Sequence, residues 1–193
     1  MNETNEKKIS ELPRWVTKEN EVLAKTRIFS LARSHRHEEG TKNFGDFYVL
    51  DASDWINVIA LTPDNKAVLV EQFRHGSEDF ELEIVGGLIE NNETPKDAAL
   101  RELREETGFV PTDESEVSLL GKVLPNPAFL NNACYTYLVT NVKKEAEQEF
   151  DIHENIIVRL EPLDKIDDLI RTGHITHSLV VAAFMWLKLK GLE

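Results

Sequence analysis

The sequence predicts an α/β fold in which helices cover both faces of a mixed β-sheet, that is, an α/β/α sandwich. Runs with strand-like patterns lie before and after one well-delimited helix at residues 95–107. The run Trp55–Leu61 is nearly all apolar, as in a strand that is buried on both faces. The apolar stretch LVVAAFMWLKL near the end is too short to span a membrane and suits a helix packed on the sheet.

Before this helix, the residue patterns predict strands separated by turn residues. The segment Thr62–Lys66 (TPDNK) is typical of a turn, and two glycines, Gly86 and Gly87, follow the last apolar run. Strands are expected at residues 21–38 (one strand or a pair), 43–51, 55–61, 67–76 and 80–85.

The helix itself has clear start and stop signals. Thr94 suits the N-cap, Pro95 the first helical position, and Asp97 lies three residues after the cap. Gly108 suits the left-handed position that ends a helix. After it, strands are expected at residues 117–123, 133–142 and 156–160, with closing helices at residues 163–171 and 177–189.

Length and charge limit the classes of function. With 193 residues, 41% hydrophobic and 30% charged, the chain suits one globular domain. Its net charge of −13 argues against nonspecific binding to nucleic acid or to an anionic membrane. The single cysteine, Cys134, cannot form an intrachain disulfide and is expected to be buried rather than nucleophilic. With no signal peptide expected in the first residues, this indicates a cytoplasmic protein.

Three carboxylates on the predicted helix point to a metal. Glu102, Glu105 and Glu106 are spaced i, i+3 and i+4, so they are expected to project near one another. Like charges at this spacing cost roughly 0.2–0.5 kcal/mol per pair, and the helix dipole disfavours anions in the last turn. A solvated charged face is the alternative. A bound divalent cation would remove the conflict, and Mg²⁺ prefers such oxygen ligands.

The region around the helix resembles the signature of the Nudix hydrolases. Nine specified positions would coincide by chance on the order of once in a billion starts. The resemblance implies hydrolysis of a nucleoside diphosphate linked to another group. It also implies a Nudix-type sandwich at residues 51–193 with an N-terminal β extension at residues 1–50. The matching string is Gly87-x5-Glu93-x7-Arg101-Glu102-Leu103-x-Glu105-Glu106-x-Gly108-Phe109.

The resemblance also implies roles for individual residues. Mg²⁺, or Mn²⁺ in its place, would be held by Glu102, Glu105, Glu106 and the carbonyl of Gly86. Glu93 and Arg101 would pair with each other or with Glu105 and fix the geometry of loop and helix.

The resemblance further implies a general base on a loop before the last strand. Glu154 is the first candidate there, with Asp151 and His153 behind it and Glu105 as the alternative within the helix.

Two segments outside the helix resemble the subgroup acting on ADP-ribose and nucleotide sugars. The segment EQFR ends in Arg74, which would contact phosphate or ribose, and Glu83 is a second candidate for the substrate site. The loop LPNPAFLNN, with Pro127 and Asn131, would read the substrate. The expected products are a nucleoside monophosphate and a sugar phosphate. An ordinary strand end exposed to solvent is the alternative for Arg74.

Two other functions stay open. One is hydrolysis of a dinucleoside polyphosphate or capped RNA, although the acidic balance weighs against RNA. The other is a nucleotide-sensing domain without turnover, although such domains often lose glutamates that are present here. The region Glu21–Asp51 would pair across a two-fold axis, because in the subgroup such extensions build homodimers; Ile28, Phe29 and Phe47 would suit that interface.

Overall fold

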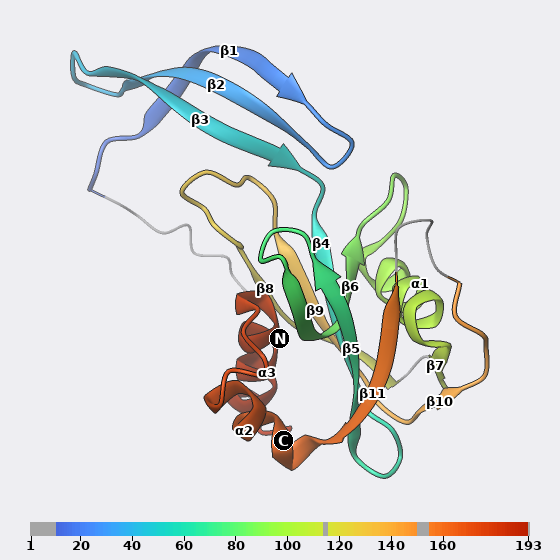
Figure 1. Cartoon of the computed structure of the whole chain (residues 1–193). Helices are drawn as coiled ribbons and strands as arrows, with labels where there is room; N and C mark the ends of the chain where they lie inside the picture. Colours follow the sequence, from blue (N-terminus) through green and yellow to red (C-terminus); the bar gives the residue numbers. More distant parts are fainter. Residues whose placement is uncertain (1–10, 114–115, 150–154, 193) are drawn as a thin grey trace. The chain divides into compact units, whose positions relative to one another are not determined.

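The computed structural model describes residues 11–113, 116–149 and 155–192, and the chain separates into two compact units (Figure 1). One unit holds the described residues up to Ala52 together with Ala128–Asn131. The other holds Ser53–Pro127 and the described residues from Asn132 onward. Each unit is considered by itself below.

The first unit contains an antiparallel three-stranded sheet in the order β1-β2-β3. The region in which one strand or a pair was expected forms two strands, because Thr26 closes a turn with Phe29: its Oγ1 accepts from the Phe29 amide at 3.0 Å. Within these strands only Ala32 and Ser34 are buried. The strands are β1 (Trp15–Lys25), β2 (Phe29–Glu38) and β3 (Phe44–Ala52).

The second unit is built on a six-stranded sheet in the order β11-β5-β6-β4-β9-β8. Strands β4 and β9 are parallel and the other pairs are antiparallel, so the sheet is mixed as predicted. Strand β6 pairs with β5 up to Ile84 and with β4 from Val85 onward. The strands are β4 (Trp55–Ala60), β5 (Lys66–Arg74), β6 (Asp79–Leu88), β8 (Val117–Val123), β9 (Cys134–Val139) and β11 (Ile156–Pro162).

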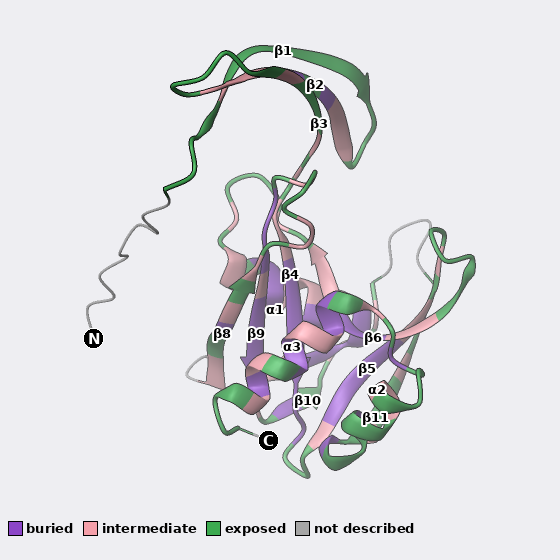
Figure 2. Cartoon of the chain, turned by 90° about the vertical axis from the view of Figure 1, so that its left-hand side faces the viewer, coloured by how far each residue is buried: buried purple, intermediate pink, exposed green. Residues whose placement is uncertain are grey.

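Helices cover both faces of this sheet, which confirms the predicted sandwich. Helix α1 (Pro95–Thr107) packs into one apolar cluster with residues of β4, β5, β6 and β9. On the other face, α3 (Ser178–Leu189) shares a second cluster with α2 (Ile166–Arg171) and the 3₁₀ turn η2 (Leu163–Lys165). Figure 2 shows the buried residues, in purple, concentrated in these strands and the helix faces against them. Among the described helices, none has both the length and the apolar character needed to cross a bilayer.

Two details differ from the sequence-based expectations. The strand expected at residues 133–142 divides into β9 and β10 (Val142–Lys144), because Asn141 adopts a left-handed backbone with φ of 52°. Strand β10 pairs with β7 (Phe109–Pro111), which was not predicted.

Candidate active site

Helix α1 begins and ends at the residues that the sequence predicts. The Oγ1 of Thr94 accepts from the Asp97 amide at 3.2 Å, and Gly108 ends the helix with φ of 72°. Ala98, Ala99 and Leu103 are fully buried in the cluster beneath the helix. This apolar face fixes the rotation of α1 and thereby the directions of its glutamates.

The end of β6 comes very close to the helix at Gly87. A Cβ atom added to Gly87 would lie 2.1 Å from Oε1 of Glu102, well inside van der Waals contact. Only glycine therefore leaves room for this carboxylate. Glu102 is in consequence seated against the strand end, with its side chain 15% exposed.

Arg101 joins the carboxylates of this region. Its guanidinium binds both oxygens of Glu93, with Nε–Oε1 at 2.9 Å and Nη2–Oε2 at 3.1 Å. Its Nη1 donates to Glu102 Oε1 at 2.8 Å and to Glu105 Oε2 at 3.0 Å, and Nη2 also donates to the Leu88 carbonyl at 3.1 Å. The hydrogen bonds from Arg101 hold the pKa of Glu93 below its ordinary value. These hydrogen bonds confirm the expected pairing of Arg101 with Glu93 and Glu105.

Glu106 differs from the other helix carboxylates because it is buried. Only 4% of the residue is exposed, whereas the side chain of Glu105 is 34% exposed. Burying a carboxylate is unfavourable unless it is compensated by hydrogen bonds, an opposite charge or a metal.

The donor chemistry of α1 fits a hard divalent cation, but the described side chains are not gathered as expected. Carboxylate and carbonyl oxygens are the ligands that Mg²⁺ prefers. Within residues 11–113, 116–149 and 155–192, no three acidic, histidine or cysteine side chains form a group able to hold a metal ion. Arg101 instead binds Glu102 and Glu105 through one nitrogen. A cation held by both would have to displace that contact. The metal roles of Gly86, Glu102, Glu105 and Glu106 therefore stay predictions.

A second arginine lies at the far end of β5. Arg74 binds Glu83 of β6 through two hydrogen bonds, Nε–Oε1 at 2.5 Å and Nη2–Oε2 at 2.8 Å. The Glu83 side chain is 3% exposed and that of Arg74 is 43% exposed. Alternation along β6 puts Glu83 on the same face as Val85 and Gly87, the face that α1 covers.

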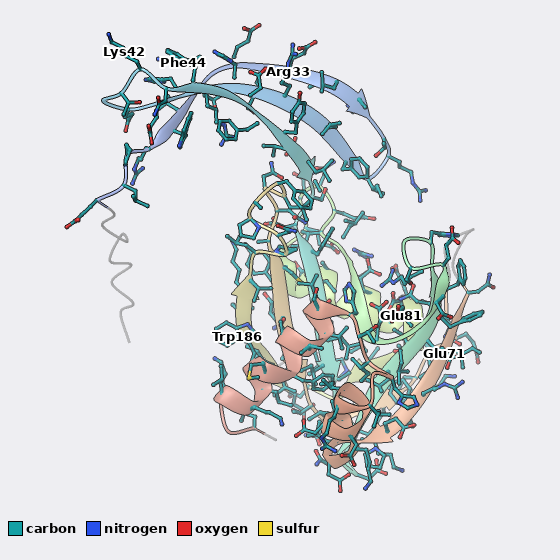
Figure 3. The ribbon with its side chains drawn as sticks, turned by 60° about the vertical axis from the view of Figure 1, so that its left-hand side comes forward. Arg33, Lys42, Phe44, Glu71, Glu81 and Trp186 are labelled. Atoms are coloured by element: carbon teal, nitrogen blue, oxygen red, sulfur yellow. The ribbon has the colours of Figure 1, made fainter. Side chains whose placement is uncertain are left out.

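Sequence reasoning missed His177, which approaches the same carboxylate. Its Nδ1 lies 3.5 Å from Glu83 Oε2. The preceding residue, Thr176, donates to Glu81 Oε2 at 2.6 Å, and Figure 3 labels Glu81. The only sequence signal was the position of His177 as the first residue of a predicted helix.

Two of the remaining predicted residues are described, one in each compact unit. Asn131 belongs to the first unit, where its side chain donates to Asp51 Oδ1 at 2.5 Å and accepts from the Ala52 amide at 3.2 Å. Pro127 is exposed and belongs to the second unit. Glu154 lies outside the described residues, as do Asp151 and His153.

Two other features carry no catalytic signal. Cys134 is fully buried, and burial raises the pKa of its thiol to about 12, so it is not a nucleophile at neutral pH. A hollow of about 240 Å³ lies among residues of η2, α2 and α3, and none of its lining residues belongs to the groups described above.

The comparisons with known proteins agree on one family. A family model described as "NUDIX domain" matches residues 55–184. A methanol dehydrogenase activator from Bacillus methanolicus is 33% identical over 136 residues, which cover 70% of this chain and 72% of that protein. An ADP-ribose pyrophosphatase from Bacillus subtilis (strain 168) is 28% identical with the same coverage.

A solved structure described as an ADP compounds hydrolase has the same fold. Its TM-score is 0.80 at 22% identity, with 96% of this chain and all of that chain covered. At this identity the likeness shows the fold alone, and it includes the mixed sheet with helices on both faces.

Proposed function

The chain belongs to the NUDIX domain family, and from this premise we propose that it hydrolyses the diphosphate linkage of ADP-ribose or a related nucleoside diphosphate sugar. The products are a nucleoside monophosphate and a sugar phosphate. The observation that carries the proposal is the close approach of Gly87 to Glu102, which sets a carboxylate of α1 against the end of β6. The similarity to an ADP-ribose pyrophosphatase supports the substrate class.

In this proposal a divalent cation, Mg²⁺ or Mn²⁺, is held by Glu102, Glu105, Glu106 and the carbonyl of Gly86. When bound, the cation neutralises charge on the diphosphate oxygens and activates water. Arg101 orients the Glu102 and Glu105 carboxylates through its hydrogen bonds, and its bond to the Leu88 carbonyl ties the helix to β6. Glu93 fixes the orientation of Arg101 from the loop before the helix.

Arg74 binds the substrate in the same proposal. A planar guanidinium suits bidentate recognition of phosphate, and 43% of this side chain is exposed. The buried carboxylate of Glu83 holds the guanidinium at the end of β5 and reduces the rotamer freedom that is lost on binding. Pro127 and Asn131 are proposed to contact the base or the sugar.

Glu154 is proposed as the general base, on the ground of the subgroup resemblance. In Glu154→Gln, kcat should fall strongly while metal and substrate affinity stay within a few-fold, because the loss is in the transition state. A fall of less than about tenfold would move this role to Glu105.

The test is a panel of nucleotide sugars, dinucleoside polyphosphates, capped RNA and nucleoside triphosphates with Mg²⁺, followed by phosphate release after added phosphatase. ADP-ribose or another nucleotide sugar should give the highest kcat/KM. Asp168→Asn is a matched control for the glutamate variants, because this exposed carboxylate of α2 pairs only with the exposed Arg171 in the described contacts. A triphosphate that wins by about tenfold would assign another substrate class. Binding of nucleotides without turnover of any would favour the sensing alternative.

We also propose that residues 1–50 form a homodimer, while residues 51–193 carry the hydrolase. A sheet of three strands needs an apolar face covered to be stable, and this one buries almost no side chains in the single chain. Figure 3 shows Phe44 and Arg33 on this sheet. Among the expected interface residues, Ile28 is 53% and Phe47 38% exposed, and Phe47 packs on Trp15 with ring centroids 5.0 Å apart.

Light scattering tests the assembly. The expected mass is twice the 22.0 kDa of the chain. Ile28→Asp should shift the mass toward the monomer, because a charge would replace an apolar contact. A wild-type species near 22.0 kDa at micromolar concentration would refute the dimer. A cytoplasmic location, supported by the single cysteine, also stays a prediction.

A further inference from the structure

The C-terminal end of helix α1 carries two of the proposed metal ligands and several carbonyls that the helix cannot satisfy. The last four carbonyls of any helix lack intrahelical partners. Here the amide of Gly108 donates to the Arg104 carbonyl at 2.8 Å, which covers the first of the four. The carbonyls of Glu105 and Glu106 need donors from elsewhere.

The segment Glu145–Glu149, called the strap below, provides both donors. The amide of Glu149 donates to the Glu105 carbonyl at 2.9 Å. The side-chain Nε2 of Gln148 donates to the Glu106 carbonyl at 2.6 Å. The strap therefore binds the backbone of the two residues whose carboxylates are proposed to hold the cation.

The strap is fixed to the helix end by further contacts. The amides of Glu145 and Ala146 both donate to the Gly108 carbonyl, at 3.0 and 3.1 Å. Arg104 forms an ion pair with Glu149 at 3.2 Å, although both side chains are more than half exposed and such a pair contributes little.

Gly108 makes this approach feasible. A Cβ atom there would lie 2.2 Å from the Ala146 carbonyl oxygen, which is a backbone atom and cannot swing away. The same glycine thus ends the helix with a positive φ and leaves room for the strap.

We propose that the strap positions the Glu105 and Glu106 carboxylates for divalent cation binding, through the Glu149 amide on the Glu105 carbonyl and the Gln148 side chain on the Glu106 carbonyl. This inference rests on the proposed function, since it concerns the cation that the function requires. Gln148 touches neither cation nor substrate, so it is a positioning residue. Its Nε2 donates at the negative end of the α1 dipole, where a donor is favoured and a carboxylate is not.

The two variants of Gln148 change the donor while keeping the length of the side chain. Gln148→Glu replaces the N–H donor with an oxygen that repels the Glu106 carbonyl. Gln148→Met removes the donor without adding charge and serves as the test if the first variant does not fold. Glu149→Gln is the control: it removes the exposed ion pair with Arg104 and keeps the backbone donor to Glu105.

Mg²⁺ binding to the folded proteins is measured by calorimetry, and kcat and KM for ADP-ribose are measured at saturating Mg²⁺. In Gln148→Glu the Kd for Mg²⁺ should rise about tenfold, the size of effect seen when partners behind metal ligands are removed. KM at saturating Mg²⁺ should stay near the wild-type value, and Glu149→Gln should bind Mg²⁺ as the wild type does.

A Kd for Mg²⁺ in both Gln148 variants within about twofold of wild type would overturn the positioning role, and so would a wild type that binds no Mg²⁺. A wild type that binds Mg²⁺ but hydrolyses no nucleotide would overturn the proposed function only. In that case a raised Kd in Gln148→Glu would still support the positioning role.

Discussion

The Nudix signature has a glycine at its start, Gly87, and another next to its end, Gly108, and they are required for different reasons. At Gly87 the atom that excludes a Cβ is the end of a flexible side chain, Oε1 of Glu102. At Gly108 the φ of 72° disfavours other residues, and the excluded space is filled by a backbone oxygen of the strap. Substitution at Gly87 should therefore move the Glu102 carboxylate, whereas substitution at Gly108 should strain the fold.

The contrast extends to the carboxylates at the two ends. Glu102, near Gly87, is bound by Arg101, while Glu106, near Gly108, is buried and its carbonyl is held by the strap. If these are the ligands of one cation, the fold positions them by unlike means: a side-chain ion pair at one end and packing with backbone hydrogen bonds at the other.

The largest effect is expected from Glu106→Gln. Removing one charge from the proposed metal site should lower kcat by about a thousandfold, as for other groups that stabilise transition-state charge. Mg²⁺ should raise the Tm of the wild type but not of this variant, because ligand binding stabilises only the form that binds it. Kinetics and thermal unfolding with and without Mg²⁺ check this, with Asp168→Asn as the control. Near-native activity would remove Glu106 from the metal site.

Gly87→Ala should damage metal binding more than stability. The added methyl displaces the Glu102 carboxylate, so the Mg²⁺ concentration for half-maximal activity should rise about tenfold. The free energy of unfolding should fall by only about 1 kcal/mol, because the side chain can turn away. Gly76→Ala is the control, since a Cβ there meets open space. An unchanged Mg²⁺ requirement would show that Glu102 does not need this position.

Gly108→Ala, in contrast, should lower the free energy of unfolding more than it weakens metal binding. The left-handed backbone costs an alanine about 1–2 kcal/mol, and the clash with Ala146 adds to it. The matched control is Gly173→Ala, where φ is 76° but nothing lies within 4 Å of the added atom. Urea unfolding of both variants separates the cost of the left-handed backbone from the cost of the clash with Ala146. If the two variants lose equal free energy of unfolding, the strap moves aside at no measurable cost.

The smallest effect concerns Glu93 and has a defined pH dependence. Arg101 lowers the pKa of Glu93 in the folded state, so the ion pair stabilises the fold above the ordinary carboxyl pKa of 4.5, and this stability is lost as the pH falls through the lower folded-state pKa. At pH 7, Glu93→Gln should be less stable than wild type by about 1 kcal/mol or less, and the difference should shrink below pH 4.5.

The same substitution in an Arg101→Met background provides the control. Without the guanidinium, Glu93→Gln should have little effect at pH 7, because the pairwise term is gone. A difference that persists unchanged to low pH, or in this background, would show that the ion pair is not its source.

The sequence by itself determined the local features of the fold. Thr94, Pro95 and Gly108 bound α1 because caps and positive φ depend on neighbouring residues, and the apolar pattern identified the strands of the six-stranded sheet. The spacing of Arg101, Glu93 and Glu105 also allowed their pairing to be expected, since the partners lie on one helix and the loop before it.

Only the tertiary structure decided the contacts between distant segments. The buried carboxylate of Glu83 is approached by both Arg74 and His177, although His177 lies 94 positions after Glu83 in the chain (177 − 83). Gln148 lies in an acidic stretch with no local pattern that would mark it as a partner of Glu106, 42 residues away. The requirement for glycine at position 87 likewise depends on where α1 packs on β6, because the Glu102 side chain of α1 fills the space of a Cβ there. Periodicity and capping encode local geometry, whereas these contacts depend on how the elements pack, which no short stretch of sequence specifies.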